Sequence, residues 1–221
     1  MFYTNQPVKL TDCRLHDGSS ELFLVEGDSA ALAVTKVRSA QTQAVLPMQG
    51  KPMNTLTISE KKLLESPLFS ALIDALDAGV GTHFDLQKMR YNKIILLMDA
   101  DADGIHCGAL MLMFFYRWMR PLLENGLVEL ARPPVGEVTQ AETGEVQFAY
   151  TDAEFMRLCA PFNANKNQLH SVKYRGLAGM PPDVLARVCI EPETRKTSVM
   201  REKDAEMAIE VFAHSINEWC S

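Results

Sequence analysis

The chain has 221 residues, of which 47% are hydrophobic and 23% charged, and its formal net charge is −6. This length suits one sizeable domain with an appendage, or two small domains. No apolar stretch reaches the roughly 20 residues that cross a bilayer, and the first residues lack the basic and apolar regions of a secretory signal. Because the net charge is negative, any contact with nucleic acid must use a local basic patch, a bound metal or a basic partner.

Five cysteines are scattered along the chain without C-x-x-C spacing. This pattern argues against a zinc ribbon or a disulfide framework. It favours a reducing compartment, so we expect a cytoplasmic protein with no membrane partner.

The first 134 residues alternate between strand and helix signals. Residues 1–19 are polar and are interpreted as an N-terminal arm. Short apolar runs followed by turn residues predict buried strands at 21–26, 43–48, 93–98 and 127–131. Helical spacing predicts helices at 29–38, at 58–78 with a break at Ser66-Pro67, and at 105–123. This alternation predicts an α/β core over residues 20–134, with a Rossmann-like parallel sheet between flanking helices.

The pattern changes after Pro134. Residues 135–150 alternate around Thr143-Gly144, which predicts a hairpin. A polar loop is expected at 163–168, and helices at 152–159, 183–189 and 202–218. We therefore expect residues 135–221 to form a small α+β appendage.

Acidic residues follow two of the predicted strands. The strand at 93–98 ends in Asp99, Asp101 and Asp103, and the strand at 21–26 ends in Glu26. If these strand ends are neighbours, their carboxylates can share one divalent cation, and Mg²⁺ prefers one or two carboxylates plus water and phosphate. Asp103 also suits a helix cap, because a predicted helix begins just after it.

The spacing of the three aspartates is also that of the start of an EF-hand calcium loop. Such a loop needs a bidentate glutamate at its twelfth position, and that position is Leu110 here. The preceding segment is strand-like rather than helical, so calcium-loop chemistry is rejected.

Residues 26–30 (EGDSA) and 99–104 (DADADG) resemble the two acidic motifs of the TOPRIM domain. The resemblance is closer still to the TOPRIM region in the B-type subunits of bacterial type IIA topoisomerases, DNA gyrase and topoisomerase IV. It covers roughly residues 9 to 215. Further matching segments occur in the same order at 9–13, 46–54, 114–117, 132–134, 174–177 and 193–195.

The resemblance implies a function in DNA cleavage and religation. It implies that Glu26 is a general acid/base and metal ligand, and that Asp99, Asp101 and Asp103 hold Mg²⁺. Lys51 and His106 match further residues of the family's catalytic site. The resemblance also implies that the DNA contacts are Lys51, Asn54, Lys173 and Arg175.

The expected partners are DNA, an A-type subunit that supplies the nucleophilic tyrosine, and a separate ATPase domain, since the residues before the first strand leave no room for one.

Three departures from the family pattern leave alternatives open. Ala31 and Leu32 replace glycines, Gln49 replaces an arginine, and residues 135–137 replace a tyrosine-lysine pair. The last two remove positive charge from expected phosphate contacts. One alternative is a catalytically weak or inactive paralog that binds or regulates the A-type subunit, and another is a free-standing Mg²⁺-dependent nuclease. The sequence suits both a complete polypeptide and a segment of a longer B-type subunit.

Overall fold

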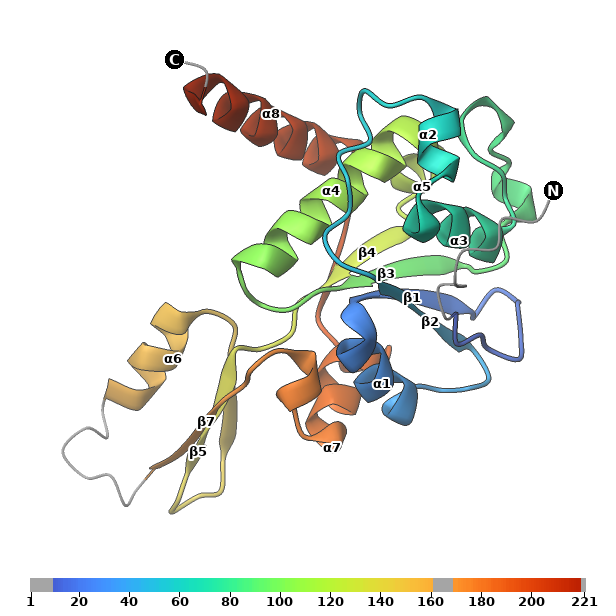
Figure 1. Cartoon of the computed structure of the whole chain (residues 1–221). Coiled ribbons are helices and arrows are strands. Elements are labelled where there is room, and N and C mark those ends of the chain that lie inside the picture. The colour runs from blue at the N-terminus through green and yellow to red at the C-terminus, as the bar shows by residue number, and fades with distance from the viewer. Residues whose placement is uncertain (1–9, 161–168, 220–221) are drawn as a thin grey trace.

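The centre of the protein is a five-stranded sheet in the order β2-β1-β3-β4-β8. Figure 1 shows its first four strands side by side. The computed structural model describes residues 10–160 and 169–219, with side chains as far as residue 212 of the last helix. The strands β2, β1, β3 and β4 are parallel, and β8 runs antiparallel to β4. The four predicted strands are confirmed, whereas β8 was not predicted. Their bounds are β1 Glu21–Glu26, β2 Gln43–Met48, β3 Lys93–Leu97, β4 Val128–Ala131 and β8 Thr197–Val199.

Side chains alternate between the two faces of this sheet, as the period of a strand requires. Leu22 and Leu24 of β1 belong to one buried cluster, and Phe23 and Val25 belong to the other. The helices α3 (Pro67–Leu76), α4 (Ala102–Trp118) and α5 (Pro121–Glu124) supply the first cluster. The second cluster is supplied by α1 (Gly27–Val37), α7 (Pro182–Leu185) and a π-helical turn at Ala186–Ile190. The predicted arrangement of a parallel sheet between helices is thus confirmed.

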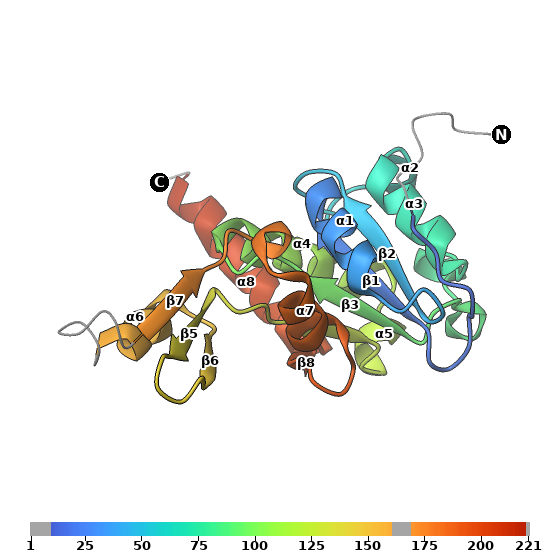
Figure 2. The ribbon, with the colours of Figure 1, turned by 90° about the horizontal axis from the view of Figure 1, so that it is seen from below.

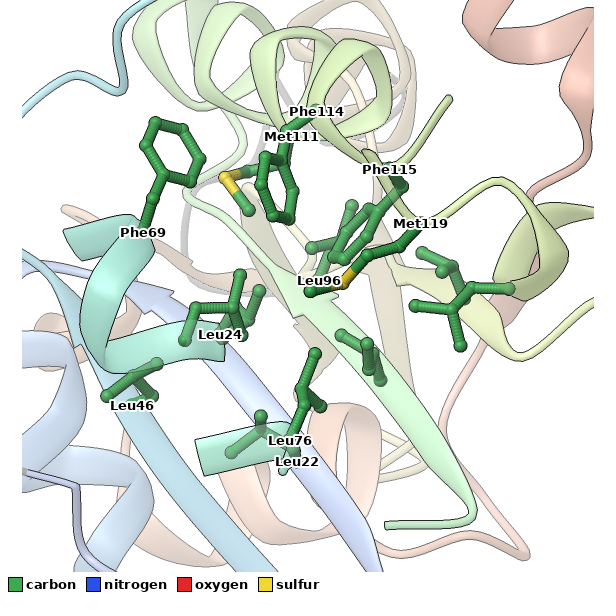
Figure 3. Packing of buried hydrophobic residues seen from close by; sticks show 14 of the residues in the cluster. Leu22, Leu24, Leu46, Phe69, Leu76, Leu96, Met111, Phe114, Phe115 and Met119 are labelled. Carbon is green, nitrogen blue, oxygen red and sulfur yellow. The ribbon is translucent and has the colours of Figure 1, made fainter. Parts of the chain in front are cut away.

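Aromatic and leucine side chains fill the first cluster (Figure 3). Leu24 lies opposite Leu46 and Leu96 on the neighbouring strands. Phe69 of α3 stacks on Phe114 of α4, with ring centroids 4.6 Å apart. Burying a side chain of this size contributes about 1.5–3 kcal/mol, so this cluster fixes α4, and with it the acidic loop that precedes α4.

The predicted helix at 105–123 is wrong at both ends. The structure has α4 at Ala102–Trp118 and a separate short α5 at Pro121–Glu124. Met119 leaves the helical conformation at φ −145°, and Pro121 has no N–H to continue the hydrogen-bond ladder. The predicted break at Ser66-Pro67 is confirmed, and it separates α2 (Glu60–Leu64) from α3.

The chain after residue 134 forms a second, three-stranded antiparallel sheet in the order β6-β5-β7. Figures 1 and 2 both place it beside the main sheet, with α6 (Asp152–Cys159) against it. The hairpin of β5 (Gly136–Gln140) and β6 (Val146–Ala149) is confirmed, whereas β7 (Leu169–Lys173) was not predicted. The predicted loop at 163–168 lies outside the described residues.

Segments after residue 134 also complete the main sheet. They contribute β8 to its edge and α7 to one of its faces, and α8 (Glu202–Trp219) runs along α4. The division at residue 134 into a core and an appendage remains a prediction. Within the described ranges, no helix combines the length and apolarity that a bilayer span requires.

A buried ion pair joins the first strand to the segment before β8. The side chains of Arg195 and Glu21 are only 4% and 9% exposed. Arg195 Nη1 donates to Glu21 Oε2 at 2.7 Å, and Gln43 Nε2 donates to the same oxygen at 3.0 Å. The charge on Glu21 is therefore matched by a residue from the far end of the chain.

Asp12 fixes the segment that leads into β1. Its carboxylate accepts hydrogen bonds from Tyr91 Oη at 2.7 Å, from Arg90 Nη2 at 2.6 Å and from the backbone N–H of Cys13 at 2.8 Å. Partial burial opposes ionisation, but the hydrogen bonds outweigh it and lower the pKa of Asp12 to about 2. The carboxylate therefore stabilises the fold at neutral pH.

We expect Asp12→Ala to destabilise the protein at pH 7 by about 1 kcal/mol, a value reduced because solvent screens this partly exposed group. The stability that the Asp12 carboxylate adds to the wild type is complete above its unfolded pKa of 3.8. It is lost as the pH falls toward the folded pKa of about 2. Urea unfolding of both proteins between pH 7 and pH 2 measures this difference. The exposed helical residue Asp74 provides a control, because Asp74→Ala should change stability by less than about 0.5 kcal/mol. A constant difference across the pH range would contradict this role of Asp12.

Candidate metal and nucleic-acid site

The acidic residues meet at the carboxyl edge of the main sheet. The strands β1 and β3 are hydrogen-bonded neighbours, with Val25 opposite Leu97. Glu26 ends β1, and Asp99 follows β3 by two residues. The acidic groups that the sequence predicts for one site therefore lie on adjacent strand ends, the position that open α/β sheets use for ligands.

Glu26 has an unsatisfied buried carboxylate oxygen. Its Oε2 is buried without a hydrogen-bond partner in the described part of the chain, and its Oε1 lies 3.9 Å from Cys107 Sγ. Burial raises the pKa of Glu26, and the charges of Asp99 and Asp101 raise it further, whereas Lys51 opposes them. A divalent cation would offset the repulsion among these acids and could take Oε2 as a ligand, so the residues present fit a metal at this edge.

Asp99 is held between two glycines. Its Oδ1 accepts a hydrogen bond from the backbone N–H of Leu177 at 2.8 Å. A side chain at Gly176, where φ is +69°, would place its Cβ 2.5 Å from Asp99 Oδ2. At Gly104 a Cβ would lie 2.1 Å from the backbone oxygen of Asp99. Gly176 and Leu177 thus hold Asp99 in place, a role that the sequence pattern of residues 174–177 does not indicate.

Asp101 and Asp103 play different parts at the start of α4. Asp101 caps the helix, because its Oδ1 accepts a hydrogen bond from the N–H of Gly104 at 2.8 Å. The exposed carboxylate of Asp103 instead pairs with Lys51, whose Nζ lies 3.0 Å from Oδ1. The same Nζ lies 3.0 Å from Nδ1 of His106. The structure thus brings together the predicted residues Lys51, Asp103 and His106, and the lysine neutralises the outermost acid.

The four predicted DNA contacts divide into two groups. Lys173 and Arg175 line a cavity of about 450 Å³ together with Asp99 and Asp101. Lys173 is also paired with Asp152, with 2.8 Å between Nζ and Oδ1. Cations and acids around one cavity would suit a phosphate held between them if the acids bind a metal.

Lys51 and Asn54 precede α2 and do not line this cavity. Asn54 is exposed, and its Oδ1 accepts a hydrogen bond from the N–H of Leu56 at 3.0 Å. Lys51 instead approaches the acids through Asp103, on the α4 side of the site. The DNA-contact role of all four residues remains a prediction.

Within the described residues, Asp12, Cys13 and His16 are three side chains whose ligand atoms all lie within 4.8 Å of one another. The predicted acids do not form such a trio, which is compatible with Mg²⁺ because that ion retains several waters. Arg90 Nη2 lies 2.6 Å from Asp12 and 2.9 Å from His16 Nε2. A guanidinium at this distance occupies the trio and repels a cation, so we interpret the trio as a structural contact.

We expect Mg²⁺ to stabilise the wild-type protein by about 1.4 kcal/mol when its free concentration is ten times its Kd. Asp99→Asn should lose most of this stabilisation, because it removes charge beside Glu26. Thermal unfolding in an Mg²⁺ titration, with EDTA as the metal-free reference, measures the effect. Asp74→Asn is a matched control on the exposed face of α3 and should retain the full shift. Equal shifts in all three proteins would contradict a metal site at Asp99.

Comparison with known proteins agrees with the geometry. The family model described as "Toprim domain" matches residues 21–133, more than half of the chain. The chain is 40% identical over 207 residues to the DNA gyrase B-type subunit of Halalkalibacterium halodurans, covering 93% of the chain and 32% of that relative. The identities are 39% over 210 residues for the corresponding gyrase protein of Thermotoga maritima and 36% over 216 residues for that of Archaeoglobus fulgidus.

These matches cover 95% and 97% of the chain, and 32% and 33% of the two relatives. The chain thus spans about a third of the length of the curated relatives it matches. The ordered acids at the edge of the parallel sheet coincide with the matched region, and the chain belongs to the Toprim domain family.

Proposed function

We propose that this chain supplies the metal-binding acids of a type IIA DNA topoisomerase, in the manner of the B-type subunit of DNA gyrase. The supporting observation is the buried, unpartnered Oε2 of Glu26 beside Asp99 and Asp101 at the end of β1. An A-type subunit supplies the nucleophilic tyrosine, and ATP hydrolysis belongs to a separate domain. The complex acts on DNA in the cytoplasm.

In this proposal Glu26 moves the proton. Because burial and neighbouring acids raise its pKa, its carboxyl holds a proton more readily than an ordinary glutamate. It can donate that proton to the leaving 3′ oxygen during cleavage and recover it during religation. Mg²⁺, when bound, stabilises charge on the phosphoryl oxygens.

The other residues of the site position the groups around Glu26. Glu26, Asp99 and Asp101 would hold the metal. Asp99 is kept in place by the N–H of Leu177, and Asp101 by its cap on α4. Lys51 pairs with Asp103. Glu26, Asp99 and Asp101 then remain as the carboxylates that would bind the cation.

The test is reconstitution with the A-type subunit of a relative and a separate ATPase region. We expect cleaved DNA, covalently joined to the A-type subunit, to accumulate with Mg²⁺ and to disappear with EDTA. If DNA is nicked without an A-type subunit, the function is that of a nuclease. If the two proteins associate tightly but no cleavage complex forms, the chain is a binding module, and the proposal fails.

A further inference from the structure

A second cavity lies at the junction of the two sheets, away from the acids. Its volume is about 280 Å³. None of its lining residues lines the cavity at Asp99. The end of β6 and the residue after it form one wall, and the segment between α7 and β8 forms the other. The lining residues are Phe148, Tyr150, Arg187, Val188, Thr194 and Lys196.

Two cations face this cavity, and each lies over an aromatic ring. The guanidinium carbon of Arg187 is 5.4 Å from the ring centroid of Phe148, and Lys196 Nζ is 4.3 Å from that of Tyr150. Both contacts join the segment before β8 to the small sheet. A ring face orients a cation without neutralising it, since the attraction comes from the ring quadrupole rather than from a negative charge.

Among the described residues, neither cation forms a salt bridge. In the described ranges no carboxylate oxygen lies within 4.0 Å of Arg187 or Lys196, whereas Lys173 pairs with Asp152 and Arg195 with Glu21. The carboxylate of Glu191, on the same segment, lies 3.3 Å from the hydroxyl oxygen of Thr194. Two positive charges without a direct carboxylate contact thus share one cavity, in a chain whose net charge is −6.

Backbone contacts hold the walls in place. The hydroxyl of Thr194 donates to the carbonyl of Arg187 at 2.5 Å, which closes the loop between them. The N–H of Arg132 donates to the carbonyl of Lys196 at 3.1 Å and ties that residue to the end of β4. Fixed walls mean that a ligand need not order the loop, which lowers the entropic cost of binding.

We propose that this cavity is a phosphate-binding site that works without a divalent metal. Arg187 supplies a planar fork suited to two phosphate oxygens, and Lys196 supplies a point charge. The shared chemistry is a phosphate group, either in the DNA backbone or in a small free phosphate compound. We assign it to the DNA backbone. That assignment rests on the proposed function, whereas the anion site itself does not.

The experiment uses the full chain in EDTA, so that metal-dependent binding at the acids is absent. Two probes are compared, a short fluorescent DNA duplex and inorganic pyrophosphate. The variants are Arg187→Gln and Lys196→Gln, with Lys196→Arg as the conservative exchange. Arg157→Gln is the matched control, because Arg157 lies exposed on α6 with only a 3.9 Å contact to Glu154. Circular dichroism verifies that each variant is folded.

For the duplex, each glutamine variant should weaken binding several-fold and reduce the slope of log K against log salt by about 0.9, the value for one phosphate contact. Lys196→Arg should retain both the wild-type affinity for the duplex and the wild-type salt slope. Pyrophosphate binding, followed by calorimetry, should also fall in the two glutamine variants. Arg157→Gln should match the wild type with both probes.

If both probes bind the glutamine variants as tightly as the wild type, the site does not exist. An equal loss in Arg157→Gln would show diffuse charge attraction instead and would also overturn the proposal. If only pyrophosphate binding falls, the site is supported but its assignment to DNA is overturned. Because no A-type subunit or metal is present, failure here is distinguishable from failure of the cleavage assay.

Discussion

Glu26→Gln should lower the rate of DNA cleavage by the reconstituted complex about 10²- to 10⁴-fold, the usual contribution of a positioned general acid or base. Glutamine has nearly the same shape but can neither carry the proton nor bring a negative charge to the metal. The rate is measured with Mg²⁺ in excess, as the appearance of DNA joined to the A-type subunit. Binding of the DNA in EDTA should change less than the cleavage rate, because the substitution removes no cation.

Glu65→Gln is a suitable control for this experiment, because Glu65 is exposed at the end of α2. It makes the same chemical change and should leave cleavage at the wild-type rate. Wild-type cleavage by Glu26→Gln would remove Glu26 from the proposed chemistry. A loss of DNA binding as large as the loss of cleavage would assign Glu26 to positioning of the DNA instead.

Gly104→Ala should destabilise the protein by about 3 kcal/mol, at the upper end of overpacking effects. The added methyl group would lie 2.1 Å from the backbone oxygen of Asp99 and 3.0 Å from its backbone nitrogen. Because backbone atoms cannot swing away as a flexible side chain can, the acidic loop must shift. Urea unfolding measures the loss, and the stabilisation by Mg²⁺ should fall with it, since Asp99 moves.

Gly108 provides a control in the same helix. It is also buried in α4, but a Cβ there would meet only Leu130 and Met98 at 4.0 Å. Gly108→Ala should therefore be neutral or stabilise by up to about 1 kcal/mol, the difference in helix propensity between the two residues. If the two variants unfold at the same urea concentration, the contact at Asp99 does not constrain residue 104.

The sequence predicted the parts of the fold that depend on local patterns. Strands β1 to β4 are short apolar runs followed by turn residues. The acids that end β1 and follow β3 identified the edge of the sheet where Glu26 and Asp99 meet. The hairpin at Gly144 follows from its alternation and a glycine at φ +69°. These features depend on residues that are close together in the sequence, so the pattern of a single sequence is enough to predict them.

The missed features depend on contacts between distant segments. The strand β8 has three residues and is recognisable only beside β4, with Leu130 opposite Ser198. The N–H of Leu177 reaches Asp99 from a loop 78 residues later, and nothing in the local pattern of that loop indicates an acidic partner. The apolar run continues across Pro121, so the sequence pattern does not reveal the helix break at Met119.

The ion pair between Glu21 and Arg195 also bears on how the chain folds during synthesis. The two residues are 174 positions apart, so the parallel strands emerge from the ribosome long before the guanidinium that neutralises Glu21. Until Arg195 and the residues around it have been made, Glu21 and the apolar side chains Phe23 and Val25 of β1 lack the segment that covers them, and its packing is part of the stability of the finished domain. The nascent sheet is therefore expected to remain open to chaperones and proteases until β8 has been made. A truncated protein that stops near residue 133, where the family match ends, lacks Arg195 altogether and should therefore be less stable than the whole chain.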